Sequence, residues 1–355
     1  MGRRVLVAMS GGVDSSAAAW LLRRQGYDCA GAIMRLHGGE TEGVCGSADN
    51  VEDARAAACR AGIPFHVFDF QEEFSRQVVD PFVRAYLRGE TPNPCIDCNR
   101  CLKFGKFLER ARELGFDYIA TGHYARIAPL ADGTLVLCKA ADPGRDQSYV
   151  LASSMTRECL RRTLFPLGGM TKPEVRRLAE EAGFLNARKK DSQDICFVPD
   201  GDYGAFLERR TGRAFPPGDI LDLDGRPAGR HRGAVRYTLG QRKGLGIAAD
   251  APVYVCGKSM ADNTLTVGPE TALYARTLIA DGWVWGAGTP PESPLRVHAK
   301  VRYRQTEQPA LAEILSDGRV RLTFDEPQRA ITAGQAAVLY QGDAVLGGGT
   351  IREVP

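Results

Sequence analysis

Two features of this sequence suggest chemistry: a loop rich in glycine and serine near the start, and cysteines placed along the chain. The loop is Ser10-Gly11-Gly12-Val13-Asp14-Ser15-Ser16, which follows a short apolar run and precedes a helical stretch. Glycines let a ligand approach the backbone closely, and the unpaired N–H groups at a helix start attract an anion. Serine hydroxyls add donors, so pyrophosphate is the natural guest. The loop fits neither the Walker A pattern nor the dinucleotide pattern, and it therefore predicts another kind of nucleotide site.

Three cysteines recur at intervals of three in the segment 91–104: Cys95, Cys98 and Cys101. This spacing suits the ligands of a metal ion or an iron–sulfur cluster. It equally suits one thiolate nucleophile activated by a helix start and by Arg100 or Lys103. Pro92 and Pro94 stiffen the segment, as expected of a loop that presents its side chains. The residues alone leave both kinds of site open.

A further cysteine, Cys196, follows the basic run Arg188-Lys189-Lys190, which would activate a thiol and attract phosphate. A lone cysteine before an aromatic residue is more often packed than reactive. Together with Cys98 it indicates sulfur chemistry, because two thiols can exchange persulfide and disulfide bonds. The other six cysteines are expected only to pack: Cys29, Cys45, Cys59, Cys138, Cys159 and Cys256.

Basic residues gather locally, although 46 Lys and Arg nearly balance 43 Asp and Glu for a net charge of +3. The stretch 226–249 carries six Lys or Arg side chains, many glycines and no acidic residue. It favours an adaptable surface that contacts phosphate, although scattered arginines are often simply solvated. Further on, the segment 300–304 alternates basic side chains with Tyr303, whose ring is able to stack on a base.

The elements that must position these residues change in type along the chain. In the first half, strand-like segments (5–9, 29–36, 64–70 and 116–121) alternate with helical ones (17–24, 51–60 and 102–114). This alternation predicts an α/β domain over residues 1–199, with a doubly wound parallel sheet. Residues 200–275 are expected to form a small, mostly β, RNA-contacting domain, and residues 276–355 an antiparallel β-barrel.

Composition narrows the class of protein further. With 44% hydrophobic and 25% charged residues, the chain is expected to be globular. Its start is too short for a signal peptide, and it has no apolar run of about 20 residues. We therefore expect a cytoplasmic protein without membrane contact, whose cysteines do not form a secreted disulfide scaffold.

Further motifs complete an ordered set along the chain: Thr121-Gly122-His123-Tyr124-Ala125-Arg126, Asp146-Gln147-Ser148-Tyr149, and the segments 237–246, 326–332, 334–337 and 346–349. The glycine loop resembles the pyrophosphate loop of N-type ATP pyrophosphatases. With the cysteine segments, the whole set resembles one family, the tRNA-specific 2-thiouridylases. The resemblance covers nearly the whole chain and implies an α/β fold of the adenine-nucleotide alpha-hydrolase type.

The resemblance implies sulfur transfer to the wobble uridine (U34) of tRNAs for Lys, Glu and Gln. ATP, with Mg, would adenylate the C2 oxygen of the uracil, and a persulfide would deliver sulfur to C2 as AMP leaves. By position, Cys196 would carry the persulfide, and Cys98 would be the partner thiol that forms a disulfide with it. The sulfur would come from a relay protein or a cysteine desulfurase.

The resemblance also implies binding residues at the anticodon loop and the nucleotide. ATP would contact Ala8, Met9, Ser10, Gly11, Gly12, Val13, Asp14, Ser15, Ser16, Met34 and Gly122. The tRNA would contact Asn93, Asp97, His123, Asp146, Gln147, Ser148, Arg302, Tyr303 and Gln335.

One position departs from the family. Some members carry Asp three residues before the first catalytic cysteine, where this chain has Cys95. A carboxylate acid or base at that position is therefore in doubt, and a minority hypothesis places an iron–sulfur cluster on Cys95, Cys98, Cys101 and Cys196. Two other functions compete. An amide- or guanidine-forming synthetase would leave the cysteine pair idle, and an RNA-binding module would not need the intact loop.

Overall fold

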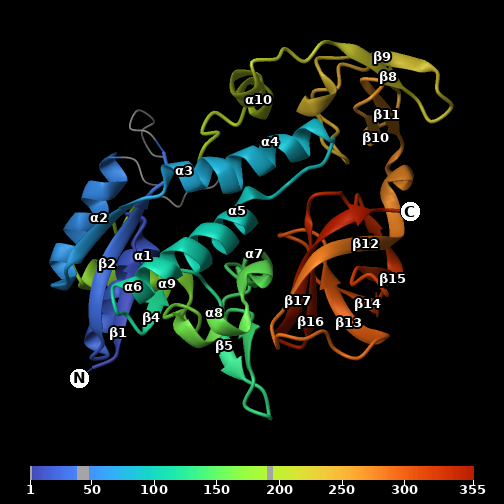
Figure 1. Ribbon diagram of the computed structural model, residues 1–355. Coiled ribbons are helices and arrows are strands. Elements are labelled where there is room, and N and C mark those ends of the chain that lie inside the picture. Colours follow the sequence, from blue (N-terminus) through green and yellow to red (C-terminus); the bar gives the residue numbers. More distant parts are fainter. Residues whose placement is uncertain (1, 38–47, 190–194) are drawn as a thin grey trace.

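The computed structural model describes residues 2–37, 48–189 and 195–355. An α/β region comes first, a small β domain follows, and a β-barrel ends the chain. The α/β region and the barrel lie side by side, and the small β domain lies above the barrel in the view of Figure 1. Within the described ranges, no helix is long and apolar enough to cross a membrane.

The α/β region is built on five parallel strands in the order β3-β2-β1-β4-β7. Their bounds are β1 Arg4–Ala8, β2 Asp28–Arg35, β3 Phe65–Asp69, β4 Tyr118–Ala120 and β7 Thr163–Leu164. Val5 and Val7 pack on one face, in a core shared with α1 (Val13–Arg24), α2 (Ala48–Ala61) and α9 (Lys172–Glu181). Leu6 and Ala8 pack into a second core on the other face. Because successive strand residues point to opposite faces, the predicted doubly wound sheet is confirmed.

Helices cover the second face of this sheet. The first run is α3 (Gln71–Phe74), η1 (Ser75–Val79) and α4 (Asp80–Leu87), and the second is α5 (Pro94–Asp97), η2 (Cys98–Lys106) and α6 (Phe107–Glu113). The sequence predicted this second run only from residue 102. It begins at Pro94 because the side chain of Asn93 accepts a hydrogen bond from the backbone N–H of Cys95, and proline suits a first helical turn. The cysteine segment is therefore helical and not an open loop.

Shorter helices complete the α/β region: α7 (Ser148–Leu151), η3 (Ala152–Ser154) and α8 (Arg157–Arg162). At the start of α9, Thr171 and Glu174 form a reciprocal capping box, which fixes where this helix begins.

The small β domain has four strands in the order β10-β11-β8-β9. Its elements are α10 (Tyr203–Thr211), β8 (Gly218–Leu221), β9 (Pro227–His231), η4 (Ala234–Arg236), β10 (Tyr254–Ser259), β11 (Thr264–Gly268) and η5 (Glu270–Leu273). Ile220, Val255 and Leu265 are fully buried in its core.

The stretch 226–249 in this domain is less uniformly basic than the sequence predicted. Three arginines form ion pairs, all with acidic residues from outside the stretch: Arg226 with Asp224, Arg230 with Asp219, and Arg236 with Asp202 and Glu208. His231 and Tyr237 are buried. Arg232, Arg242 and Lys243 are exposed and keep the predicted character.

The C-terminal domain is a closed antiparallel barrel. Its strands are β12 (Tyr274–Trp285), β13 (Leu295–Lys300), β14 (Gln308–Ile314), β15 (Val320–Arg329), β16 (Ala336–Gln341) and β17 (Ala344–Glu353). Pairing of β12 with both β15 and β17 closes the sheet, which confirms the predicted barrel. The glycines of β17 allow close packing, since a Cβ at Gly347 would lie 2.6 Å from the carbonyl oxygen of Val284.

A hairpin from the α/β region extends the barrel sheet, and the sequence did not predict it. β5 (Arg126–Pro129) and β6 (Leu135–Cys138) pair with each other, and β6 pairs with β17. Arg126 also forms an ion pair with Asp343 at 2.6 Å, and Lys139 pairs with Glu307. These contacts fasten the barrel to the region that holds the glycine loop.

Candidate active site

The glycine loop joins β1 to α1 in a shape that glycine makes possible. Gly11 has a φ of +75°, and a Cβ there would lie 2.6 Å from the carbonyl oxygen of Asn50. Gly12 is the N-cap residue of α1 and brings no side chain to cap the helix. The start of α1 therefore has no side-chain cap, as suits a helix start that binds an anion.

The serine hydroxyls of the loop form hydrogen bonds within the loop itself. Ser15 Oγ accepts a hydrogen bond from the N–H of Ser10 and donates to the carbonyl oxygen of Gly12, both at 3.1 Å. Ser16 Oγ also donates to that oxygen at 3.0 Å, and Ser16 is fully buried. These hydroxyls fix the loop from within, whereas Ser10, Gly12, Val13 and Asp14 line the adjoining cavity.

Two residues that the sequence analysis missed hold this loop. Lys172 Nζ donates to both carboxylate oxygens of Asp14, at 2.8 and 2.7 Å, and its side chain is only 6% exposed. Asn186 Nδ2 donates to the carbonyl oxygen of Gly11 at 3.0 Å and to Ser16 Oγ at 3.1 Å. A cation in the first turn of a helix opposes the helix dipole. Lys172 directly follows the N-cap residue Thr171, and this unfavourable place for a cation could have predicted that it pairs with an acidic residue elsewhere in the chain.

The other residues predicted to contact ATP surround the loop. A Cβ at Gly122, which follows β4, would lie 2.7 Å from the backbone nitrogen of Ser15, so only glycine fits there. Met34 lies in β2, and Ala8 ends β1. Met9 is 2% exposed and its backbone nitrogen donates to Ala32, so its side chain belongs to the core.

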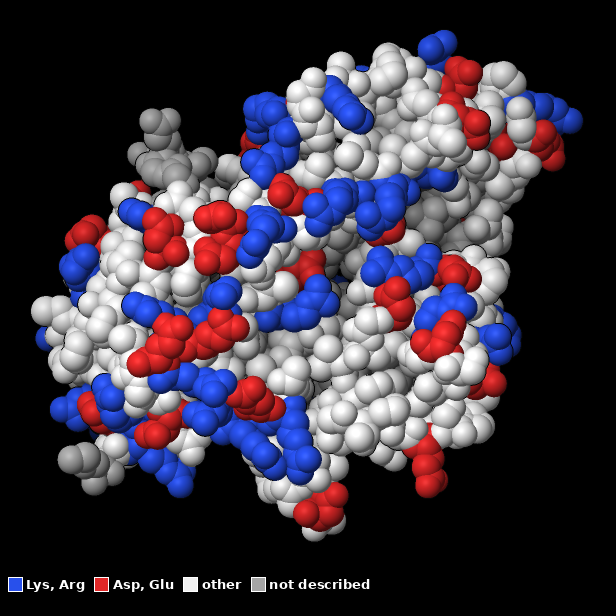
Figure 2. All heavy atoms as spheres, viewed as in Figure 1, with Lys and Arg blue, Asp and Glu red and all other residues white. Residues whose placement is uncertain are grey.

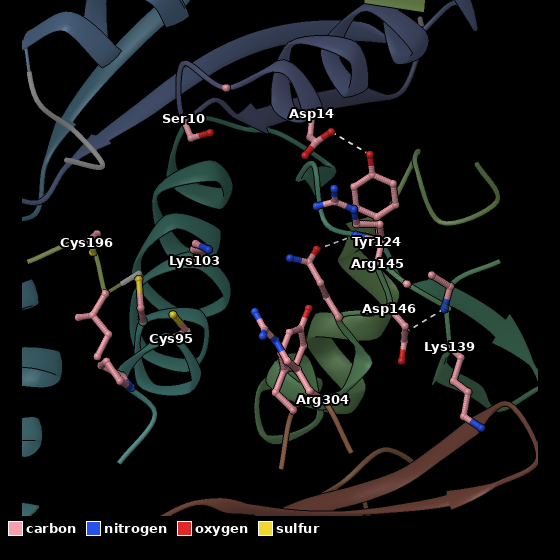
Figure 3. Close-up of a pocket in the computed structure, with 18 of the residues that line it drawn as sticks. Ser10, Asp14, Cys95, Lys103, Tyr124, Lys139, Arg145, Asp146, Cys196 and Arg304 are labelled. Atoms are coloured by element: carbon pink, nitrogen blue, oxygen red, sulfur yellow. Dashed lines mark hydrogen bonds between the residues drawn. The ribbon is translucent and has the colours of Figure 1, made fainter. Parts of the chain in front are cut away.

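A cavity of about 1250 Å³ lies in front of the loop and extends to the barrel. It is lined by Cys95, Cys98 and Cys196 on one side and by Tyr303 and the basic side chains Lys139, Arg145, Lys300 and Arg304 on the other. Figure 3 shows the labelled cysteines across the cavity from Arg145, Asp146 and Lys139. The surface view in Figure 2 shows blue basic side chains, mixed with red acidic ones, around the hollow between the α/β region and the barrel.

The cysteines at the cavity differ in exposure. Cys95 is exposed, whereas Cys98 and Cys196 are partly buried, as is Cys101, which does not line the cavity. Although Cys95 reaches the cavity, the surrounding protein desolvates it and raises the pKa of its thiol, while Lys103 acts in the opposite direction. Desolvation also raises the pKa of Asp97, opposed chiefly by Arg100, which donates to it at 2.6 Å.

The structure does not support the iron–sulfur hypothesis. Among the described residues, which include all four cysteines concerned, no group of three or more Cys, His, Asp or Glu side chains is placed to hold a metal ion. The reason is local: Cys95, Cys98 and Cys101 follow one another along consecutive helical turns. At a rise of about 1.5 Å per residue, the first and third are about 9 Å apart along the axis.

The six cysteines expected only to pack differ in how far they are buried. Cys29, Cys138 and Cys159 are buried, as predicted, whereas Cys256 is partly buried. Cys59 in α2 is exposed, and the expectation is wrong for it. Cys45 lies outside the described residues, as does the part of the basic run at 190–194.

Residues predicted to contact tRNA from the α/β region make many contacts within the chain. His123 Nδ1 lies 2.7 Å from Thr121 Oγ1, and desolvation holds the pKa of His123 well below its usual value. Asp146 accepts the hydroxyl of Ser148 at 2.7 Å, and Ser148 is fully buried. Gln147 accepts the N–H of Tyr124 at 2.9 Å. Asp146 and Gln147 line the cavity, whereas His123 and Ser148 lie behind its lining.

Three predicted residues come from the barrel. Arg302 donates to the carbonyl oxygen of Ala330 at 2.5 Å, and desolvation lowers its pKa. Gln335 Nε2 donates to the carbonyl oxygen of Thr91 at 2.6 Å, which ties the barrel to the start of the cysteine segment. Tyr303 is 40% exposed and lines the cavity. Its ring is therefore accessible from the cavity.

Three family models match successive parts of the chain. They are a tRNA methyl transferase HUP domain over residues 3–200, a tRNA methyl transferase PRC-barrel domain over 204–269 and an aminomethyltransferase beta-barrel domain over 275–351. Among solved structures, the U34-tRNA thiolase NcsA from Methanococcus maripaludis with its [4Fe-4S] cluster is similar at 18% identity. That similarity covers 59% of this chain and 66% of that chain, with a TM-score of 0.37.

Full-length relatives are much closer in sequence. The chain is 49% identical over 357 residues to the tRNA-specific 2-thiouridylase MnmA of Geotalea uraniireducens (strain Rf4), covering 98% of this chain and 95% of that protein. It is 48% identical over 357 residues to the protein of the same name from Moorella thermoacetica (strain ATCC 39073 / JCM 9320), covering 98% and 99%. Because such identity extends over nearly the entire length of each protein, the chain belongs to the tRNA-specific 2-thiouridylase family.

Proposed function

We propose that this chain forms 2-thiouridine at the wobble position (U34) of tRNAs for Lys, Glu and Gln, at the expense of ATP. The observation that carries the proposal is one cavity lined by the glycine loop, by Cys98 and Cys196, and by Tyr303 with basic neighbours. The reaction needs this arrangement, because the same uracil carbon is activated by a nucleotide and attacked by sulfur. The names of the full-length relatives support the same reaction.

The first step is adenylation at the glycine loop. The N–H groups at the start of α1 hold the phosphates, and the C2 oxygen of the uracil attacks the α-phosphorus while pyrophosphate leaves. Mg²⁺ in nucleotide sites takes one or two carboxylates together with phosphate oxygens, and the Asp14 carboxylate fits that role. An ion held by Asp14 would neutralise phosphate charge. Lys172 and the hydroxyl of Tyr124, which donates to Asp14 at 2.8 Å, keep this carboxylate oriented.

The second step is sulfur transfer from Cys196. The terminal sulfur of its persulfide attacks C2, the bond from C2 to the adenylated oxygen breaks, and AMP leaves. The thiolate of Cys98 then attacks the sulfur of Cys196, which releases 2-thiouridine and leaves a disulfide between the two cysteines. The sulfur donor is a persulfide carrier, either a relay protein or a cysteine desulfurase, and the reaction belongs to the cytoplasm.

The tRNA lies between the α/β region and the barrel. The base of U34 must leave its stack before its C2 atom can reach the nucleotide and the cysteines, and Tyr303 provides a ring on which this base can stack. Lys300 and Arg304 lie beside Tyr303 in the lining and suit the phosphates. Asn93, Asp97, His123, Arg302 and Gln335 are proposed to shape or contact the anticodon loop around it.

Separate measurement of pyrophosphate and AMP tests this order of steps. With unmodified tRNA, ATP, Mg²⁺ and a persulfide donor, the wild-type chain should release both products. Asp14→Ala should release neither, because adenylation fails. Cys196→Ser should release pyrophosphate once per site but no AMP, because sulfur transfer fails. Cys256→Ser, a partly buried cysteine of β10, is the matched control and should behave as wild type.

Two results would contradict the proposal. Full thiolation by Cys196→Ser would remove the persulfide assignment. Release of pyrophosphate without tRNA, driven instead by ammonia or an amino acid, would indicate an amide-forming synthetase.

A further inference from the structure

We infer that Cys95 is a third redox thiol of this site: it takes over the disulfide bond from Cys196 after sulfur transfer and presents it to an external dithiol reductant. The inference rests on the proposed function, because a disulfide between Cys98 and Cys196 arises only if these residues carry the sulfur chemistry. It goes further because it explains how Cys98 and Cys196 return to free thiols after each turnover.

The position of Cys95 and Cys98 on one helix start suits a disulfide between them. α5 begins at Pro94 and Asn93 caps it, so Cys95 lies in the first turn, and Cys98 follows three residues later at the start of η2. Side chains three apart on a helix have Cβ atoms about 5–6 Å apart. A disulfide needs about 3.5–4.5 Å, so a small local adjustment closes the bond. Cys-X-X-Cys motifs are among the sites where cysteine thiols are activated.

The three thiols differ in their exposure to solvent, and we assign them different roles on this basis. Cys95, Cys98 and Cys196 all line the same cavity, but only Cys95 among these three is exposed. Figure 3 shows Cys95 and Cys196 on the same side of the cavity. Lys103 also lines the cavity, and its positive charge partly offsets the desolvation that raises the pKa of the Cys95 thiol. Cys101, although described and only three residues beyond Cys98, lies outside that lining.

The exchange balances without an oxidant. The thiolate of Cys95 attacks the sulfur of Cys98 in the Cys98–Cys196 disulfide, a bond forms between Cys95 and Cys98, and Cys196 leaves as a thiolate. Cys196 is then ready to accept the next persulfide sulfur. A dithiol reductant attacks the exposed Cys95 sulfur, returns both thiols of the motif and leaves as its own disulfide.

Disulfide mapping after one turnover tests the inference. Persulfidated full-length chain is mixed without reductant with ATP, Mg²⁺ and unmodified tRNA, quenched with acid and alkylated, and the peptides are identified by mass spectrometry. Wild type should carry the Cys95–Cys98 disulfide and an alkylated Cys196. In Cys95→Ser the bond should remain between Cys98 and Cys196. Cys101→Ser, which removes the equally spaced cysteine outside the lining, should give the wild-type pattern.

A second arm needs no tRNA and separates the inference from the proposed function. Wild-type chain oxidised with one equivalent of diamide should also collect the Cys95–Cys98 disulfide. The inference would be overturned if neither arm gave the Cys95–Cys98 disulfide. It would also be overturned if a Cys98–Cys101 disulfide formed in equal yield. Iron and sulfide bound to Cys95 and required for thiolation would overturn it as well. If thiouridine never forms but diamide gives the expected bond, the proposed function has failed and the redox motif stands.

Discussion

Replacing Gly122 by alanine tests how the sheet shapes the glycine loop. The added Cβ would lie 2.7 Å from the backbone nitrogen of Ser15 and 2.8 Å from the carbonyl carbon of Asp14, whereas ordinary contacts begin at 3.4 Å. Both neighbours are backbone atoms, so the start of α1 must move by about 0.7 Å. Overpacking of this kind costs about 1–3 kcal/mol.

The displacement falls on the N–H groups that would hold phosphate. A hydrogen bond to a charged group contributes about 1.5–3 kcal/mol, so losing one between this helix start and a phosphate should raise the Kd for ATP on the order of 10- to 100-fold. The melting temperature should fall by about 2–12 °C, at about 2–4 °C for each kcal/mol. Isothermal titration with ATP and calorimetric unfolding measure the two effects.

Gly169→Ala is the matched control for Gly122→Ala. A Cβ at Gly169 meets nothing within 4 Å, so this variant should bind ATP and unfold as wild type does. Wild-type ATP affinity in Gly122→Ala would refute the reasoning, as would an equal loss in Gly169→Ala.

Three further predictions concern the ion pair, a buried histidine and the stacking ring. Lys172→Met should lower the free energy of unfolding by about 1–3 kcal/mol, because it leaves the Asp14 carboxylate, 28% exposed, without its cation. Urea unfolding measures this, and adding Asp14→Asn should recover part of the loss; no recovery would contradict the ion-pair explanation. Burial lowers the pKa of His37 from 6.5 to about 4, so the unfolded chain binds the extra proton and stability should fall as pH drops from about 6.5 to 4. His37→Gln should flatten that part of the pH profile, and an unchanged profile would count against the burial effect. Tyr303→Ala should raise the KM for tRNA about 10-fold while the KM for ATP stays constant, since stacking contributes about 1–3 kcal/mol per base. The exposed Tyr274 on β12 is the control position, and an equal effect of Tyr274→Ala would exclude a specific role for Tyr303.

Local patterns in the sequence were enough to predict much of this structure. The apolar run of β1 has no polar face, and it proved to be covered on both sides. The capping box at Thr171 and the glycine loop before α1 depend on neighbours within a few residues, and the loop has its predicted place between a strand and a helix. Such features are predictable because their interactions lie within one element.

Features that depend on distant contacts were missed. Lys172 and Asp14 are 158 residues apart, and nothing in either segment specifies the other as its partner. The β5–β6 hairpin joins the barrel through one edge strand, β17, which the local pattern of residues 126–138 does not reveal. The hydrogen bonds that the hydroxyl of Ser15 forms inside the loop were missed for a related reason. The composition of the loop alone does not distinguish such hydrogen bonds from hydrogen bonds to a ligand.

Nucleoside mass spectrometry tests the central claim most directly. Unmodified tRNA for Lys, Glu or Gln is incubated with the full chain, ATP, Mg²⁺ and a persulfide source, digested and compared with a reaction that contains Cys196→Ser. The account predicts 2-thiouridine at U34, one AMP for each sulfur inserted, and no 2-thiouridine with the variant. Thiouridine formed without ATP, or formed equally well by Cys196→Ser, would contradict it.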